Sequence, residues 1–256
     1  MSFTIATAGK GGTGKTTLSG LMIDYMIKNG QSPILAVDAD ANSNLNEVLG
    51  IEIETTIGQI REEVNRAEMA AVNPIPAGMS KMDYLDFKFS GAIIEQRDFD
   101  MLVMGRTQGE GCYCYVNGML KTQLQKFAKN YDYIVMDNEA GMEYISRGVL
   151  PSVDVILLVS DCSRRGIQAV GRIAQLVKDL EIKAKKIGLI VNKVPNGILN
   201  DGIKEEIATQ KLDLIGVVPQ DDLIYEYDSH GTPTTQLPED SVSKKAIAEI
   251  MHSLGL

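Results

Sequence analysis

The sequence has no surplus of positive charge. Its 256 residues carry 25 Lys and Arg against 34 Asp and Glu, which gives a formal net charge of −9. Proteins that scan nucleic acid through its phosphate backbone are usually basic, so we expect no nucleic-acid partner. The longest apolar run, Val153–Val159, contains Asp154 and is far shorter than the roughly 20 residues of a membrane-spanning helix, so we expect no membrane partner.

Signals for export and for disulfide bonding are also missing. The first residues lead directly into a strand-like segment, without a basic leader, a long apolar stretch or a small-residue cleavage site, so a cytoplasmic protein is predicted. Three cysteines are an odd number, which argues against a disulfide framework. Cys162 directly follows a predicted strand and is interpreted as a buried thiol. Cys112 and Cys114 raise the question of metal or redox chemistry.

Strand-like and helix-like segments alternate along the whole chain, with no repeat, low-complexity tract or Pro/Ser-rich linker between them. The strand-like runs are apolar throughout, which predicts an α/β fold: a mostly parallel twisted sheet with helices on both faces, in a single domain over residues 1–256. The predicted strands are Phe3–Ala8, Pro33–Val37, Met101–Met104, Tyr133–Met136, Val153–Val159, Lys186–Val191 and Leu214–Val217. The predicted helices are Lys15–Lys28, Thr56–Val72, Asn117–Asn130, Gly166–Leu180 and Ser241–Leu254, and Ser80 is a candidate cap for a further helical segment that reaches about Ile94.

A phosphate-binding motif directly follows the first strand. Residues 9–17 match the pattern G-x-x-x-x-G-K-[ST] between a strand and a helix, which is the context that the motif requires. Its glycines let backbone N–H groups converge on phosphate oxygens, and the helix N-terminus adds a positive field. Lys15 is expected to contact the β- and γ-phosphates, and the Thr16 hydroxyl to bind Mg²⁺. The predicted nucleotide-binding residues of this loop are Gly11, Gly12, Thr13, Gly14, Lys15, Thr16 and Thr17.

A second lysine, Lys10, lies near the start of this loop. The whole string resembles the deviant Walker A loop of the nitrogenase iron protein, MinD, ParA and related ATPases. The resemblance implies a P-loop NTPase fold of the SIMIBI type and a homodimer in which Lys10 is catalytic, because it reaches the partner's phosphates as an arginine finger does. The alternative is a solvated loop lysine.

Two strand ends carry acidic residues. Asp40 follows the second strand in a segment that resembles the family's switch I, and it is the candidate catalytic residue that orients the attacking water. Asp38, two residues earlier, is interpreted as mainly structural. Asp137 ends the strand Tyr133–Met136 and is expected to hold Mg²⁺ through a water, in a segment to Gly141 that resembles switch II.

The identity of the nucleotide base is predicted from an aspartate that the sequence lacks. The guanine signature N-K-x-D needs an acidic side chain at its last position, and here the residue is Pro195, which cannot accept hydrogen bonds from guanine. Adenine is therefore predicted, and with it ATP and ADP as ligands. The family resemblance implies that Asn192 and Pro219 surround the base.

Cys112 and Cys114 form a Cys-x-Cys pair. Zinc normally takes four protein ligands, which is more than the pair in one chain provides. Two copies that face each other across a two-fold axis would bring four sulfurs together. A tetrahedral cage suits Zn²⁺, whereas a flatter arrangement suits Ni²⁺ or Cu²⁺. The alternative is a pair of small apolar residues packed under a loop.

Residues 104–114, 131–143 and 159–169 resemble the CooC-type nickel-insertion ATPases, which are accessory proteins of carbon monoxide dehydrogenase. The resemblance implies an ATPase that inserts nickel into apo carbon monoxide dehydrogenase or a related nickel enzyme, with Ni²⁺ or Zn²⁺ at a dimer-bridging Cys₄ site. The iron protein holds its cluster with two widely separated cysteines that this chain lacks, so electron delivery is disfavoured. The alternative function is that of a MinD- or ParA-like positioning ATPase, which switches membrane or DNA binding.

Overall fold

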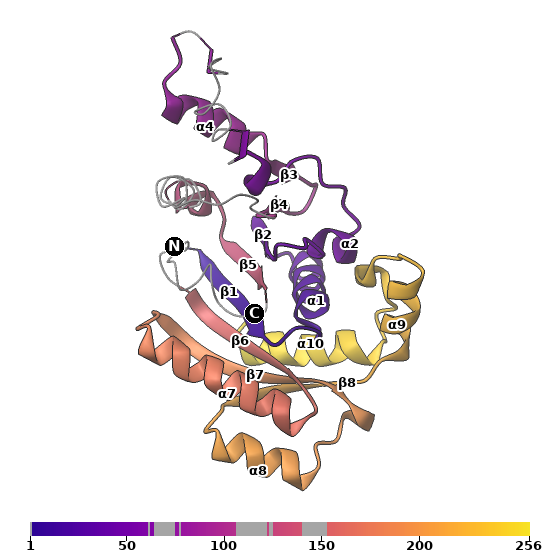
Figure 1. The fold of residues 1–256 in the computed structure, drawn as a ribbon. Coiled ribbons are helices and arrows are strands. Elements are labelled where there is room, and N and C mark those ends of the chain that lie inside the picture. Colours follow the sequence, from indigo (N-terminus) through magenta and orange to yellow (C-terminus); the bar gives the residue numbers. More distant parts are fainter. Residues whose placement is uncertain are drawn as a thin grey trace.

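The computed structural model describes residues 2–60, 62–63, 75–76, 78–105, 122, 125–139 and 153–256. An eight-stranded sheet in the order β3-β4-β2-β5-β1-β6-β7-β8 runs through these residues (Figure 1). Neighbouring strands are parallel, except that β3 runs antiparallel to β4 at the edge. The strands are β1 Phe3–Gly9, β2 Ile34–Ala39, β3 Ile93–Glu95, β4 Asp100–Val103, β5 Tyr133–Asn138, β6 Val153–Asp161, β7 Ala184–Val194 and β8 Leu214–Pro219.

Helices cover both faces of this sheet. They are α1 Lys15–Lys28, α2 Leu45–Leu49, α4 Lys81–Ser90, α7 Arg164–Asp179, α8 Asp201–Thr209, α9 Asp222–Ser229 and α10 Val242–Ser253, with the short 3₁₀ helices η1 Ala128–Asn130, η2 Pro195–Gly197 and η3 Thr234–Gln236. α4, α7 and α8 pack on one face, against strand residues that include Ala6 and Ile156. α1 and α10 pack on the other face, against Ile5 and Leu157. The predicted fold class is confirmed, because strands that are apolar on both sides need cover on both faces.

The seven predicted strands are all present, and β7 extends beyond its predicted range at both ends, to Ala184 and Val194. The predicted α1, α7 and α10 agree with the structure to within about two residues. Residues 57–60 and 62–63 are helical, as are 122 and 125–127, so the helices predicted over Thr56–Val72 and Asn117–Asn130 are seen in part and otherwise lie outside the described residues. Three short helices, α2, α8 and α9, were not predicted.

α4 extends away from the β3 end of the sheet (Figure 1). Ser80 caps it as predicted, since its hydroxyl accepts a hydrogen bond from the Asp83 N–H at 3.1 Å. The predicted end near Ile94 is wrong: the helix stops at Ser90, and Ile93 and Ile94 pair with β4 instead. β-branched residues favour such a strand over a helix.

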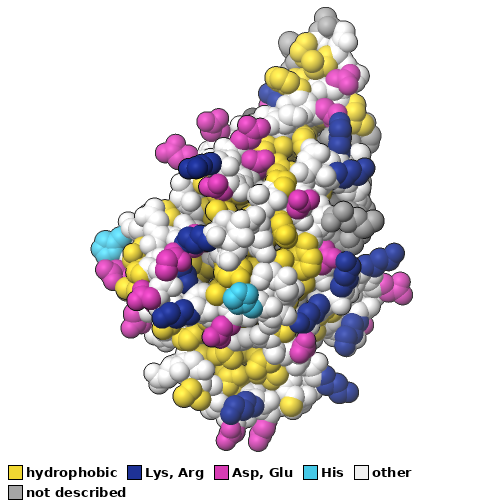
Figure 2. All heavy atoms as spheres, turned by 180° about the vertical axis from the view of Figure 1, so that it is seen from behind, with side chains coloured by type: hydrophobic (Ala, Val, Ile, Leu, Met, Phe, Trp, Pro, Cys, Tyr) yellow, Lys and Arg dark blue, Asp and Glu magenta, His cyan; other side chains and the backbone are white. Residues whose placement is uncertain are grey.

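The face seen in Figure 2 carries Lys and Arg side chains interspersed with Asp and Glu. Within the described ranges, no helix combines the length and the apolar composition that crossing a lipid bilayer requires.

Candidate functional site

The phosphate loop connects β1 to α1 as predicted. Gly14 precedes the first turn of α1 with a left-handed backbone, φ 92°, and offers no side chain to cap the helix. A Cβ on Gly14 would lie 2.3 Å from Asn192 Nδ2, so both the backbone angle and the space require glycine. The free N–H groups of the helix start are therefore open to an anion.

Lys15 is the first residue of α1 after this loop and is only 7% exposed. Its Nζ donates to the Lys10 carbonyl at 3.3 Å, and the same carbonyl accepts a bond from Thr13 Oγ1 at 2.9 Å. Burial lowers the pKa of the Lys15 ammonium, while the carboxylates of Asp137, Asp40 and Glu139 oppose that shift. Three acidic side chains thus partly offset the effect of burial on this lysine.

Asp38 and Asp40 stand at the end of β2. Asp38 is fully buried, and its two oxygens accept the Asp40 N–H at 2.9 Å and the Leu45 N–H at 3.0 Å. Burial raises the pKa of the Asp38 carboxyl to about 7, although these two hydrogen bonds lower it. Asp38 therefore shapes the turn between β2 and α2, and Asp40, which is partly exposed, projects from that turn.

Asp137 lies on the neighbouring strand β5, in register with Asp38. It is 1% exposed, and its Oδ1 accepts bonds from Thr7 Oγ1 at 2.9 Å and Ser19 Oγ at 3.2 Å. Burial raises the pKa of this carboxyl, while the Thr16 and Thr7 hydroxyls and the Lys15 ammonium lower it. Its Oδ2 has no hydrogen-bond partner within the described part of the chain.

A cavity of about 1330 Å³ opens where these strand ends meet. Nine of the predicted site residues line it: Gly11, Gly12, Gly14, Lys15, Thr16, Thr17, Asp40, Asn192 and Pro219. Lys10, Thr13 and Asp137 do not. Thr13 is 2% exposed and turns its hydroxyl to the Lys10 carbonyl, so only its backbone remains for a ligand.

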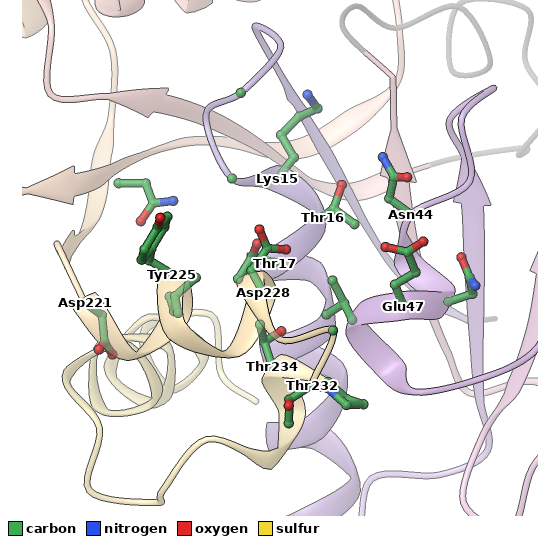
Figure 3. A pocket seen from close by; sticks show the side chains of 18 of the residues that line it. Lys15, Thr16, Thr17, Asn44, Glu47, Asp221, Tyr225, Asp228, Thr232 and Thr234 are labelled. Carbon is green, nitrogen blue, oxygen red and sulfur yellow. The ribbon is translucent and has the colours of Figure 1, made fainter.

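Two walls of the cavity were not predicted from the sequence. Figure 3 shows Asn44, which precedes α2, and Glu47 of α2 on one side of Lys15 and Thr16, and Tyr225 and Asp228 of α9 on the other. The available signals were the Asn44 and Asp221 positions, which precede these short helices; the Asp221 carboxylate caps α9 by accepting the Leu223 N–H at 3.1 Å.

The side of the cavity where the base is predicted to bind, called the base side below, is built by the ends of β7 and β8. Asn192 is 5% exposed; its Nδ2 donates to the Thr13 carbonyl at 2.9 Å, and its Oδ1 accepts the Lys193 N–H at 2.9 Å. Lys193 also lines the cavity, although the sequence analysis gave it no role. Pro219, the last residue of β8, lines the cavity as well.

The predicted transition-metal ligands, Cys112 and Cys114, lie outside the described residues, and so does Gly141. Among the residues that are described, no three His, Cys, Asp or Glu side chains gather into a metal-binding group. Cys162 is half-buried rather than fully buried, and burial raises the pKa of its thiol.

Residues 4–234 match a family model described as "CobQ/CobB/MinD/ParA nucleotide binding domain". The chain belongs to this family. An uncharacterized ATP-binding protein of Methanocaldococcus jannaschii is 42% identical over 252 residues, covering 98% of this chain and 97% of the relative. The carbon monoxide dehydrogenase accessory protein CooC of Rhodospirillum rubrum is 29% identical over 243 residues, covering 89% and 87%.

Solved structures of MinD share the fold of this CobQ/CobB/MinD/ParA-family chain. The cell division ATPase MinD of Pyrococcus furiosus superposes with a TM-score of 0.72 at 20% identity, covering 100% of this chain and 99% of that one. The septum site-determining protein MinD of Pyrococcus horikoshii, complexed with Mg-ADP, gives 0.72 at 20% identity, covering 99% and 96%. The cavity at the phosphate loop is therefore the candidate nucleotide site of this family member.

The side chains at this candidate site fit Mg²⁺. Magnesium prefers hard oxygen ligands and keeps several of its waters. The buried Asp137 Oδ2 has no hydrogen-bond partner among the residues that the structure describes, and the Thr16 hydroxyl is close enough to this carboxyl to lower its pKa. Both oxygens are of the kind that a magnesium ion prefers.

Proposed function

We propose that this chain is an ATP-hydrolysing metallochaperone, which dimerises with nucleotide or metal and inserts nickel into apo carbon monoxide dehydrogenase or a related nickel enzyme. The observation that carries the proposal is the place of Cys112 and Cys114 between β4 and β5. These two strands flank β2 and run parallel to it, so the connection leaves β4 at the edge of the sheet that carries Asp40 and Asp137. The 29% identity with CooC over most of both chains supports the same function.

In the proposed nucleotide site, the N–H groups of residues 11–17 and the Lys15 ammonium bind the phosphates of ATP. Thr16 and Asp137 would hold Mg²⁺, which neutralises charge on the β- and γ-phosphates. Asp40 orients the attacking water, because its partly exposed carboxylate reaches the cavity from a turn that Asp38 holds in place. Asn192 and Pro219 provide the adenine side.

Lys10 is proposed to act in the partner's site. It is exposed, and its ammonium makes no hydrogen bond or ion pair with the described residues of its own chain, although Lys15 beside it is buried. A cation held this way is available to phosphates across a dimer interface, where it would offset the charge that develops during phosphoryl transfer. Four cysteines from two chains would then share one Ni²⁺ or Zn²⁺ ion.

A positioning ATPase of the MinD or ParA type is the competing function. Reversible membrane binding uses an amphipathic helix with a free apolar face. In α10 the apolar residues Ile247, Ile250 and Met251 are each at most 2% exposed, because they pack on the sheet. The net charge of −9 also gives DNA no general attraction, so metal insertion is the better proposal.

The test is metal stoichiometry with solution mass, with and without ATP. We expect one Ni²⁺ or Zn²⁺ per two chains, bound more tightly with ATP, and loss of both metal and metal-promoted dimer in the double variant Cys112→Ala/Cys114→Ala. Cys162→Ala is the matched control, since it removes a half-buried thiol elsewhere and should keep the metal. Equal metal binding by the wild type and the double variant would refute the proposal, and binding to vesicles or DNA only with ATP would favour the competing function.

A further inference from the structure

Two consecutive residues at the end of β7 hold two consecutive carbonyls of the phosphate loop. Asn192 Nδ2 donates to the Thr13 carbonyl at 2.9 Å, and Lys193 Nζ donates to the Gly12 carbonyl at 3.0 Å. We call Asn192 and Lys193 the carbonyl clamp. β7 and the phosphate loop are about 180 residues apart in sequence, so the clamp is a tertiary connection and not part of the local turn.

The clamp fixes the direction of N–H groups that it does not touch. In a trans peptide, the C=O of one residue and the N–H of the next point in opposite directions across one rigid plane. Holding the carbonyls of Gly12 and Thr13 toward β7 therefore turns the N–H groups of Thr13 and Gly14 to the opposite side of the loop. These belong to the set of N–H groups that a phosphate loop directs at its ligand.

The backbone of Lys193 has a left-handed conformation that the clamp contacts support. Its φ is 56°, a left-handed conformation that residues with a Cβ disfavour. The Asn192 Oδ1 accepts the Lys193 N–H at 2.9 Å and so stabilises this turn. The turn brings the Lys193 side chain back to Gly12 although Lys193 is exposed. Such strain persists where the surrounding contacts require it.

We propose that Lys193 is a positioning residue that, together with Asn192, orients the phosphate-loop N–H groups before nucleotide binds. The clamp then sets the affinity for the phosphates, and Lys193 itself takes no part in binding the base. The inference rests on the nucleotide site of the proposed function and makes no use of its transition metal.

Affinity for a ligand without a base separates this role from contact with base or ribose. The variant is Lys193→Met, which keeps an unbranched side chain and removes the ammonium. The matched control is Lys211→Met, because Lys211 is also an exposed lysine with a left-handed backbone, φ 53°, and lies away from the cavity. The probes are ATP, inorganic tripolyphosphate and adenosine, titrated by calorimetry in the presence of Mg²⁺.

We expect Lys193→Met to lower the affinity for ATP and the affinity for tripolyphosphate by the same factor. That factor is about tenfold, which is the effect of losing one hydrogen bond from a charged group. Adenosine affinity and the control should not change, and Lys193→Arg should restore most of the affinity. The loss should persist near 1 M salt, where the Debye length is about 3 Å, because the clamp acts through a hydrogen bond. Without any ligand, amide hydrogen exchange over residues 9–17 should become faster in Lys193→Met alone.

Three results would overturn the inference. Loss of ATP affinity without loss of tripolyphosphate affinity would assign Lys193 to the base or ribose. A loss that disappears at high salt, with unchanged amide exchange, would reduce Lys193 to a distant charge. Unchanged affinity for both phosphate ligands would leave the clamp without a role. A chain that binds no nickel or zinc would change none of these measurements, so this inference and the proposed function can fail separately.

Discussion

The two sides of the nucleotide cavity are held by opposite chemistry. On the base side, the carbonyl clamp consists of donors, an amide and an ammonium, that bind backbone carbonyls of the phosphate loop. The other side is the turn between β2 and α2, which we call the switch side. There the Asp38 carboxyl accepts hydrogen bonds from the backbone N–H groups of Asp40 and Leu45. Both devices hold a loop through two main-chain groups, and both depend on a residue that is almost fully buried.

The difference lies in what burial does to each device. An amide such as that of Asn192 does not titrate, so its hydrogen bonds do not depend on pH. A carboxyl loses solvation when it is buried, and burial raises the pKa of Asp38 to about 7. The base side should therefore keep its geometry across neutral pH, while the switch side changes charge within the physiological range.

The largest effect that we predict is a pH dependence of stability that Asp38→Asn removes. The pKa of Asp38 is about 7 in the folded chain and 3.8 in an ordinary environment, so between these values the folded state holds a proton that the unfolded state has lost. This contribution to stability is therefore largest at low pH and falls as pH rises, by about 3 kcal/mol between pH 4.5 and pH 7. Urea unfolding of both proteins across this range gives the difference.

The comparison between wild type and Asp38→Asn cancels the contributions of all other titrating groups that the substitution leaves undisturbed. We expect the wild type to lose its advantage over the variant as pH rises toward 7. Two stability curves that stay parallel from pH 4.5 to pH 7 would contradict the account of the switch side.

The next effect concerns the space that the clamp needs. Gly14→Ala places a Cβ in a left-handed position and 2.3 Å from Asn192 Nδ2, so it strains the backbone and displaces the clamp. We expect a loss of about 2 kcal/mol in the free energy of unfolding, from backbone strain and a broken hydrogen bond together. Thermal or urea unfolding measures it.

Gly30→Ala is the matched control for this loss. Gly30 also has a left-handed backbone, φ 71°, but a Cβ there would meet no atom within 4 Å. The control should lose only the strain, about 1 kcal/mol. Equal losses in the two variants would show that Gly14 is required for its backbone alone and that the clamp tolerates a methyl group.

The sequence predicts the features of this site that depend on neighbours in the chain. The phosphate loop is a local pattern between a strand and a helix, and Asp40 and Asp137 follow from the rule that ligands gather at the carboxyl ends of parallel strands. Lys193 could not be found in this way. Its contact with Gly12 requires a left-handed backbone at a lysine, and that conformation depends on Asn192 and on tertiary contacts.

The walls of the cavity were missed for a related reason. α2 has 5 residues and α9 has 8, which is too short for a hydrophobic period to show in the sequence. No residue of α9 is fully buried, and its apolar residues Leu223, Ile224 and Tyr227 pack only partly against the core. Its position comes from these core contacts and from Asp221, which accepts the N–H groups of Leu223 and Ser243, so it depends on where α10 already lies.

The smallest effect that we predict tests whether α9 belongs to the base side. The Asp221 carboxylate accepts the Leu223 N–H at 3.1 Å and the Ser243 N–H at 3.2 Å, and so links the starts of α9 and α10. Asn200 caps α8 by accepting the Ile203 N–H at 2.9 Å, and it does not line the cavity. Asp221→Ala and Asn200→Ala should each lower the free energy of unfolding by about 1 kcal/mol, the usual effect of losing a helix cap.

Only Asp221→Ala should also lower the affinity for ATP, by roughly twofold to threefold. The reason is that α9 forms one wall of the cavity, and a more mobile wall contacts the nucleoside less closely. Calorimetric titration of ATP and tripolyphosphate into both variants measures this. Because tripolyphosphate has no base, its affinity should stay unchanged in Asp221→Ala, whereas Lys193→Met should lower the affinity for tripolyphosphate and for ATP alike. If both variants bind ATP as the wild type does, α9 encloses space that the nucleotide does not use, and the base lies against Asn192 and Pro219 without a contribution from α9.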